Sequence, residues 1–187
     1  MSTHEVIIAA VARYCPSDER DRRSQEETIA WLKQGEPLTY PQNQKHHLTA
    51  DGWLLSPDCS QVLLTFHHKF KLWVQLGGHV DAGETLTQAA LREVREESGI
   101  VNPELLQTEI FDLDVHTINA YAGDPHYHHD IRFLMRSPTW EFTISPESDD
   151  LRWFRPEDID ELEAKGAAIN STLTRMTQKW RQFLAKM

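Results

Sequence analysis

The stretch GHVDAGETLTQAALREVREESGI, residues 78–100, contains the pattern that decides the fold. Its second half predicts a helix over residues 85–98. Thr85 and Gln88 have the spacing of an N-terminal capping box, and Gly99 is a typical stop at the C-terminal end. The segment therefore predicts a loop, then a helix, then a tight turn at Gly99.

Three glutamates lie on one face of this predicted helix. At about 100° per residue, Glu93, Glu96 and Glu97 fall within an arc of about 100°, beside an apolar arc suited to packing. Two carboxylates about 5 Å apart repel by about 3 kcal/mol at an effective dielectric of about 20. One interpretation is a solvated acidic face that Arg92 and Arg95 partly neutralise. The other is a site for a divalent cation with hard oxygen ligands.

The wider spacing around the glutamates resembles the sequence box of the Nudix hydrolases. That box has a glycine, five residues, a glutamate, seven residues, Arg-Glu-aliphatic, one residue, Glu-Glu, one residue and Gly-aliphatic. The chain matches every specified position, with Gly78, Glu84, Arg92, Glu93, Val94, Glu96, Glu97, Gly99 and Ile100. Nine matches at fixed spacing are far more specific than a bare pair of adjacent glutamates.

The resemblance implies an α/β fold, a Nudix α/β/α sandwich around a mixed β-sheet. It also implies cleavage of a phosphoanhydride bond in a nucleoside-diphosphate-linked or similar small diphosphate. By position, Mg²⁺ or Mn²⁺ would be held by Glu93, Glu96, Glu97 and the backbone carbonyl of Gly77. Such an ion neutralises phosphate oxygens and lowers the pKa of an attacking water.

The catalytic residues implied by the resemblance are Arg92, Glu84, Glu96 and Glu97. Arg92 would hold the glutamates in position, and Glu84 would brace the loop. The general base is left open: it is Glu96, Glu97 or a residue of a later loop. The loop candidates are Glu147, Asp149 and Asp150.

The rest of the chain divides at residue 45. Residues 1–45 predict an N-terminal helical extension with helices near 5–13 and 17–33, ended by Gly35 and Pro37. Residues 46–187 predict the Nudix domain. We expect strands at 47–55, 61–68, 72–77, 109–120, 126–136, 140–144 and 151–154, and helices at 156–164 and 171–184.

A second polar group lies outside the box. Acidic and histidine side chains alternate along the two predicted strands on either side of residue 122, so each set points to one face. A hairpin turning about Ala122 would pair Asp114 with Asp130 and His116 with His128. With His126, these side chains predict a pocket for substrate phosphate or a second metal, or else a hydrogen-bonded polar network.

Several other side chains have both a functional and a structural interpretation. His79, Lys69, Lys71 and Arg132 could contact phosphate, or could serve structure and solubility alone. The aromatic residues could stack on a base or pack in the core. They are Trp53, Phe70, Trp73, Tyr121 and Trp153.

The composition limits the classes of partner. With 19 Lys and Arg against 29 Asp and Glu, the formal net charge is −10, which opposes binding to a nucleic acid polymer. No segment approaches the ~20 apolar residues of a membrane span, so we expect no membrane partner. Cys15 and Cys59 lack metal-type spacing, and with no signal peptide visible we expect a cytoplasmic protein. The apolar stripe of residues 171–184 could support a homodimer or cap the chain's own core.

Two other functions compete with hydrolysis. The first is a sensor of the same fold that binds a nucleotide without turnover. The second is an isomerase of small diphosphates, which would need a proton donor and acceptor across the substrate. The intact carboxylate cluster favours hydrolysis, because a retired site has no physical reason to keep groups that repel one another.

Overall fold

The computed structural model describes residues 2–118 and 125–186. Tyr121 and the turn about Ala122 lie outside these residues. The helices are α1 Thr3–Arg13, α2 Glu19–Leu32, α3 Leu86–Ser98, α4 Pro156–Ala164 and α5 Leu173–Leu184. The strands are β1 His46–Leu55, β2 Val62–His67, β3 Leu72–Val74, β4 Leu76–His79, β5 Glu104–Leu105, β6 Asp112–Ile118, β7 His126–Arg136 and β8 Ser148–Phe154.

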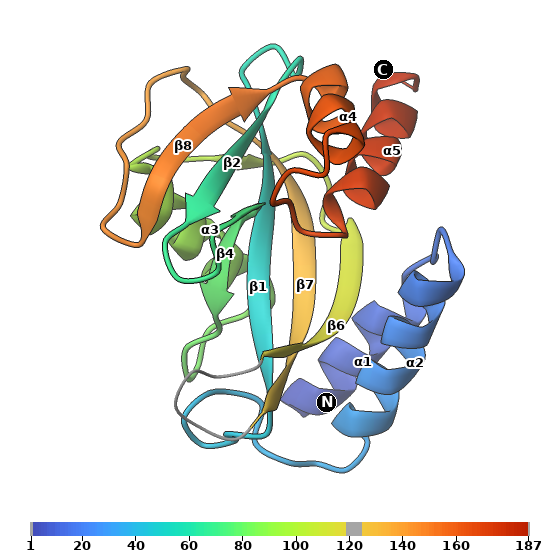
Figure 1. Cartoon of the computed structure of the whole chain (residues 1–187). Helices are drawn as coiled ribbons and strands as arrows, with labels where there is room; N and C mark the ends of the chain where they lie inside the picture. The colour runs from blue at the N-terminus through green and yellow to red at the C-terminus, as the bar shows by residue number, and fades with distance from the viewer. Residues whose placement is uncertain (1, 119–124, 187) are drawn as a thin grey trace.

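The described strands form one mixed sheet centred on β1 and β7. These two strands run parallel and pair residue by residue from His46 with Tyr127 to Leu55 with Arg136, and they lie side by side in the middle of Figure 1. The other pairings between these strands are antiparallel: β4 and β2 pair with β1, β5 and β6 with β7, and β3 and β8 with β2. The predicted mixed sheet is confirmed.

Helices pack on both faces of the sheet. Alternate residues of β1 point to opposite faces, so Leu54 joins one core with Val94 of α3, and Trp53 joins a second core with Trp180 of α5. In Figure 1, α3 lies behind the strands, whereas α4 and α5 stand in front. The predicted α/β/α layering is therefore confirmed.

The N-terminal helices cover the edge of the sheet next to β6, as Figure 1 shows. The backbone N–H of Val115, on the outer edge of β6, donates to Ser24 Oγ of α2 at 3.0 Å. This bond satisfies a strand-edge donor that would otherwise be open to another chain. Val11 of α1 and Trp31 of α2 are buried in the same core as α3. The two helices thus belong to the packing of the whole structure.

The predicted ends of α3 and α4 agree with the structure. The side chains and backbones of Thr85 and Gln88 form the expected capping box, and Gly99 ends α3 in the left-handed conformation at φ 68°. Helix α4 has the predicted bounds. The strand predicted over residues 72–77 instead divides at Gln75, because its first half pairs with β2 and its second half with β1.

The strand predicted over residues 140–144 is wrong. This segment crosses the end of α3, where the N–H of Thr143 donates to the carbonyl of Ser98 at 2.7 Å. Its alternating apolar residues reflect aromatic packing: the ring of Trp140 lies 5.5 Å from that of Trp153, and the ring of Phe142 lies 6.4 Å away. No described helix is long and apolar enough to cross a membrane.

Candidate active site

Arg92 on α3 joins the loop and the helix of the box. Its Nε and Nη2 donate to the two oxygens of Glu84 at 2.9 and 2.8 Å. Its Nη1 donates to Glu93 at 2.7 Å and to Glu96 at 3.3 Å. Nη2 also donates to the carbonyl of His79 at 2.9 Å. The hydrogen bonds from Arg92 lower the pKa of Glu84, and this guanidinium stays charged.

Two glycines of β4 let carboxylates approach the backbone. A Cβ at Gly77 would overlap an oxygen of Asp51, and one at Gly78 would lie 2.7 Å from the carboxyl group of Glu93. Real Cβ atoms do not show such contacts, so any other residue at these positions would force Asp51 or Glu93 to move. The N–H of Gly77 donates to Glu97 Oε2 at 3.1 Å.

The glutamates of the box differ in burial. Glu97 is 6% exposed, whereas the Glu96 side chain is 60% exposed. Burial, together with the charges of Glu93, Asp51 and Glu147, holds the pKa of Glu97 well above its usual range. Burial also raises the pKa of Glu93, although Arg92 opposes the shift. The carboxylates of the site therefore carry more negative charge than Arg92 neutralises.

The three loop candidates for a general base have different surroundings. Asp149 pairs with His68 at 2.5 Å and with Lys71 at 2.6 Å, and Asp150 pairs with Arg152. The charge of Glu147, which is exposed, raises the pKa of both Glu93 and Glu97. Glu147 therefore lies close enough to Glu93 and Glu97 for its charge to act on both.

The predicted register of the hairpin is confirmed. Strands β6 and β7 pair Asp114 with Asp130, His116 with His128 and Ile118 with His126. Both aspartates are buried, and both are neutralised inside the protein. Arg20 of α2 donates to the two oxygens of Asp114, each at 2.9 Å.

Arg132 is the centre of a buried ionic network, which makes the suggested phosphate contact wrong for this residue. Its side chain is fully buried. Nη1 donates to Asp112 at 2.7 Å, Nη2 to Asp130 at 2.7 Å and Nε to Asp51 at 3.4 Å. Asp112 also accepts from Arg175 and Lys179 of α5. The polar-network interpretation thus holds for the aspartates of this hairpin.

The histidines of the hairpin form a second group, which meets the ionic network where His116 Nδ1 lies 3.3 Å from Asp130 Oδ2. His128 lies beside His47 of β1, with ring centroids 4.7 Å apart, and beside His79 of β4, at 5.2 Å. Burial lowers the pKa of His47 to about 4 and that of His128 to about 3. The charge of Asp130 raises the pKa of His116.

Sequence reasoning missed Asp51 and His47. The sequence around Asp51 did contain a signal. An acidic residue inside the buried strand HHLTADGWLL needs a hydrogen-bonding or cationic partner. His47 carried none, because its contacts depend on the parallel pairing of β1 with β7. Among the aromatic candidates, Trp53 is fully buried, Trp73 and Trp153 pack on other rings, and Phe70 is 46% exposed.

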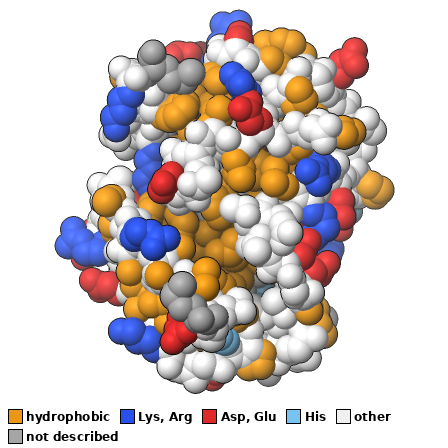
Figure 2. Space-filling view, turned by 180° about the vertical axis from the view of Figure 1, so that it is seen from behind, with side chains coloured by type: hydrophobic (Ala, Val, Ile, Leu, Met, Phe, Trp, Pro, Cys, Tyr) orange, Lys and Arg blue, Asp and Glu red, His pale blue; other side chains and the backbone are white. Residues whose placement is uncertain are grey.

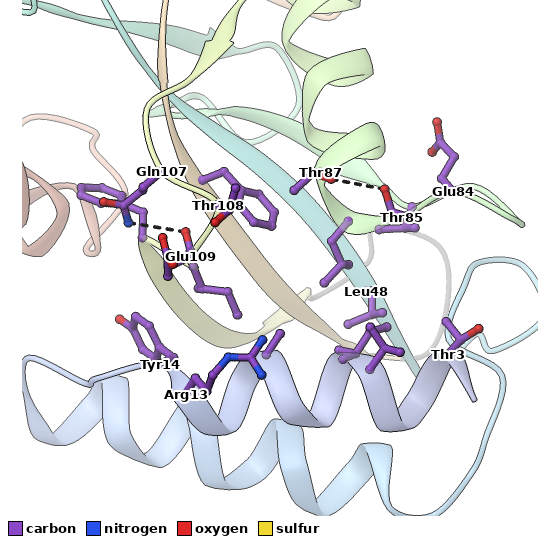
Figure 3. A pocket seen from close by; sticks show the side chains of 18 of the residues that line it. Thr3, Arg13, Tyr14, Leu48, Glu84, Thr85, Thr87, Gln107, Thr108 and Glu109 are labelled. Carbon is purple, nitrogen blue, oxygen red and sulfur yellow. Dashed lines mark hydrogen bonds between the residues drawn. The ribbon is translucent and has the colours of Figure 1, made fainter. Parts of the chain in front are cut away.

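An open cleft of 1350 Å³ lies between α1, the box loop and the segment from Gln107 to Phe111. Figure 3 shows Arg13 and Tyr14 at one side of it and Thr85 at another. Figure 2, the view from behind Figure 1, shows hydrophobic side chains gathered in a hollow across the middle of the molecule. Glu84 lines the cleft, but Glu93, Glu96 and Glu97 do not.

Comparison with known proteins shows which family the sequence matches. The NUDIX domain model matches residues 45–176. Nucleoside triphosphatase NudI of Escherichia coli is 36% identical over 93 residues, covering 46% of this chain and 64% of the relative; NudI of Shigella flexneri matches equally. The alignment thus spans less than two thirds of these relatives.

Solved structures share the fold at low sequence identity. A NUDIX-family hydrolase from Clostridium perfringens has a TM-score of 0.55 at 23% identity, covering 73% of this chain and 97% of that one. The dihydroneopterin triphosphate pyrophosphohydrolase of E. coli has a TM-score of 0.54 at 21% identity, covering 75% and 96%. With the family match over residues 45–176, the chain belongs to the NUDIX domain family.

Proposed function

We propose that the protein is a divalent-cation-dependent hydrolase that cleaves a phosphoanhydride bond in a small nucleotide. The observation that carries the proposal is the buried Glu97 carboxylate, which lies beside Glu93 and the Gly77 N–H. Among the described residues, no cationic side chain pairs with Glu97. The similarity to nucleoside triphosphatases named NudI supports a nucleoside triphosphate or a nucleoside-diphosphate-linked compound as the substrate class.

The residues fit a hard cation such as Mg²⁺ or Mn²⁺. Oxygen donors are available from Glu93, Glu96, Glu97 and the carbonyl of Gly77, and the excess negative charge on this face favours a doubly charged ion. When bound there, the ion would neutralise diphosphate oxygens and acidify the attacking water.

The remaining chemistry is assigned to side chains of the chain itself. Arg92 fixes Glu93 and ties the loop to α3 through Glu84. Arg92 and Glu84 are therefore positioning residues. Glu147 is our candidate for the general base, because it is exposed and its charge acts on both Glu93 and Glu97. It would accept a proton from the water that attacks phosphorus. Glu96 and Glu97 are the alternatives.

The test is the release of phosphate and pyrophosphate from a panel of nucleoside triphosphates, nucleotide sugars and dinucleotides, with Mg²⁺ or Mn²⁺ or with chelator. Glu97→Gln should reduce metal-dependent turnover by orders of magnitude. Glu163→Gln is the matched control, because Glu163 is exposed on α4, and it should keep full activity. Turnover that persists in chelator or in Glu97→Gln would overturn the proposal. Binding of a panel member without turnover would favour a sensor.

We also propose the division into a helical extension, residues 1–45, and a Nudix domain, residues 46–187. The homodimer and the cytoplasmic location stay predictions. Helix α5 buries Leu173, Met176 and Trp180 against the chain's own core, so its apolar stripe already has a partner within the chain.

A further inference from the structure

Five histidines form one connected group beside the box: His47, His79, His116, His126 and His128. His128 lies at the centre of the group: the ring centroids of the other four histidines are 4.7–5.5 Å from its own. The sheet brings them together from four strands. Parallel pairing aligns His47 with His128, and antiparallel pairing aligns His116 with His128. His79 pairs with Thr49, two residues along β1 from His47.

Three of these histidines present nitrogen atoms to a common point. One ring nitrogen from each of His47, His79 and His128 lies within 4.8 Å of the other two, and the Nε2 atoms of His47 and His79 are 3.1 Å apart. Nitrogens at about 2.0–2.1 Å from a tetrahedral ion stand about 3.3–3.4 Å from one another. Small side-chain rotations would therefore bring the three nitrogens around one cation.

The ring of His47 is held in the tautomer that such a site requires. Its Nδ1 lies 3.0 Å from the backbone carbonyl of Asn43, which can only accept, so Nδ1 donates and the lone pair of the neutral ring is on Nε2. Asn43 is itself fixed, since its Nδ2 donates to the carbonyl of Pro37 at 3.0 Å. Metal-binding histidines commonly have this kind of second partner.

The neighbouring group of His116, His128 and Asp130 also has converging ligand atoms, but its charge is already balanced. Asp130 accepts from Arg132 Nη2 at 2.7 Å, and a guanidinium at that distance repels a second cation. The side toward His47 and His79 is different. His79 is exposed, which gives an entry path, and His126 Nε2 is 3.2 Å from His128 Nε2.

We propose that His47, His79 and His128 bind a transition-metal cation of the Zn²⁺ class, at a site distinct from the carboxylates of the box. Imidazole nitrogen suits Zn²⁺, Co²⁺ and Ni²⁺, whereas Mg²⁺ prefers oxygen. Arg92 donates to the carbonyl of His79 at 2.9 Å, so the box and the histidine site adjoin each other at His79. The proposal does not depend on the hydrolase activity.

The test uses the full chain without a histidine tag, stripped of metal by a chelator and then dialysed. Titration with Co²⁺ should give the visible absorption of a nitrogen-ligated four- or five-coordinate ion at one equivalent, and Zn²⁺ should displace it. His79→Ala and His128→Ala should each weaken Zn²⁺ binding by more than the ~10–100-fold typical of losing an outer partner. His68→Ala is the matched control, because exposed His68 pairs with Asp149, and its Zn²⁺ affinity should be unchanged.

Glu97→Gln separates the two sites. It should leave Zn²⁺ affinity and the Co²⁺ spectrum unchanged while removing the Mg²⁺-dependent effects assigned to the box. Wild-type protein that shows no Co²⁺ spectrum and no stoichiometric Zn²⁺ binding would overturn the proposal, and the histidines would then be joined by hydrogen bonds alone. Zn²⁺ binding that survives both histidine variants but is lost in Glu97→Gln would also overturn it. Circular dichroism of each variant verifies folding.

Discussion

Replacing Glu97 by glutamine should stabilise the metal-free protein while it removes activity. Glu97 is 6% exposed, and its pKa is held well above the usual range by burial and by neighbouring carboxylates. The charged form is therefore less favourable in the folded protein than in the unfolded chain. Glutamine has nearly the same shape and can still accept the hydrogen bond from Gly77 N–H, but it carries no charge.

The magnitude follows from two opposing terms. One neighbouring carboxylate about 5 Å away raises the energy by about 3 kcal/mol at an effective dielectric of about 20. Replacing a charged acceptor by a neutral one weakens the bond from Gly77 by about 1 kcal/mol. The expected net gain is about 2 kcal/mol, which for a chain of 187 residues is a rise in Tm of about 4–8 °C.

The gain should depend on pH with a definite sign. For an acid whose pKa is raised by folding, the destabilisation is present above the folded pKa and is absent below the unfolded pKa. The difference in stability between Glu97→Gln and wild type should therefore be largest at pH 8 and should vanish as the pH falls to about 4. Urea unfolding in chelator, at several pH values, measures it.

Two controls complete this experiment. Glu163→Gln, on exposed α4, should change the stability by less than about 0.5 kcal/mol. Millimolar Mg²⁺ should raise the Tm of wild type, because the ion binds only the folded site, and should raise the Tm of Glu97→Gln less. If Glu97→Gln is no more stable than wild type at any pH between 5 and 8, the charge of Glu97 is already compensated and our reasoning about the site is wrong.

Three further substitutions test the geometry. Arg132→Met should lower the free energy of unfolding by about 3–5 kcal/mol, because it leaves buried carboxylates without their cation; a loss below 1 kcal/mol in urea unfolding would argue against the network. Gly78→Ala should reduce kcat/KM at least tenfold, because its Cβ would displace the Glu93 carboxylate, and unchanged steady-state kinetics would contradict that contact. Arg92→Lys should also reduce kcat more than tenfold, since a lysine cannot replace the bidentate contact with Glu84; rescue of full turnover by lysine would show that charge alone is needed.

The sequence was most informative where structure is set by local contacts. The capping box at Thr85 and the left-handed stop at Gly99 fix α3 within its own segment, so its bounds could be predicted. The register of β6 and β7 could also be predicted, since in an antiparallel pair one matched pair of residues determines all the others, including His116 with His128. The segment 140–144 shows the limit: alternating apolar residues there predict a strand, but they are satisfied by the ring of Trp153, which is brought near by tertiary packing.

The parts of the site that escaped prediction depend on strands far apart in the sequence. His47 and His128 are 81 residues apart (128 − 47), and they meet only because β1 and β7 pair in parallel, a pairing that no turn specifies. The same applies to Arg132, whose three carboxylate partners come from β1, β6 and β7. Its charge suggested a solvent-exposed phosphate contact, and only the sheet topology places it in the interior.

This buried network would explain how the two proposed cation sites, of different chemistry, can lie side by side. Asp51 borders Gly77 of the box, and Asp130 follows the histidines along β7. Arg132 pairs with both aspartates. Neither carboxylate is therefore free to bind a cation shared between the box and the histidine group. The box then offers oxygen donors and the histidine group offers nitrogen donors. Arg132→Met should therefore reduce the discrimination between Mg²⁺ and Zn²⁺ as well as the stability, and competitive dialysis of the two ions against the folded variant would measure that change.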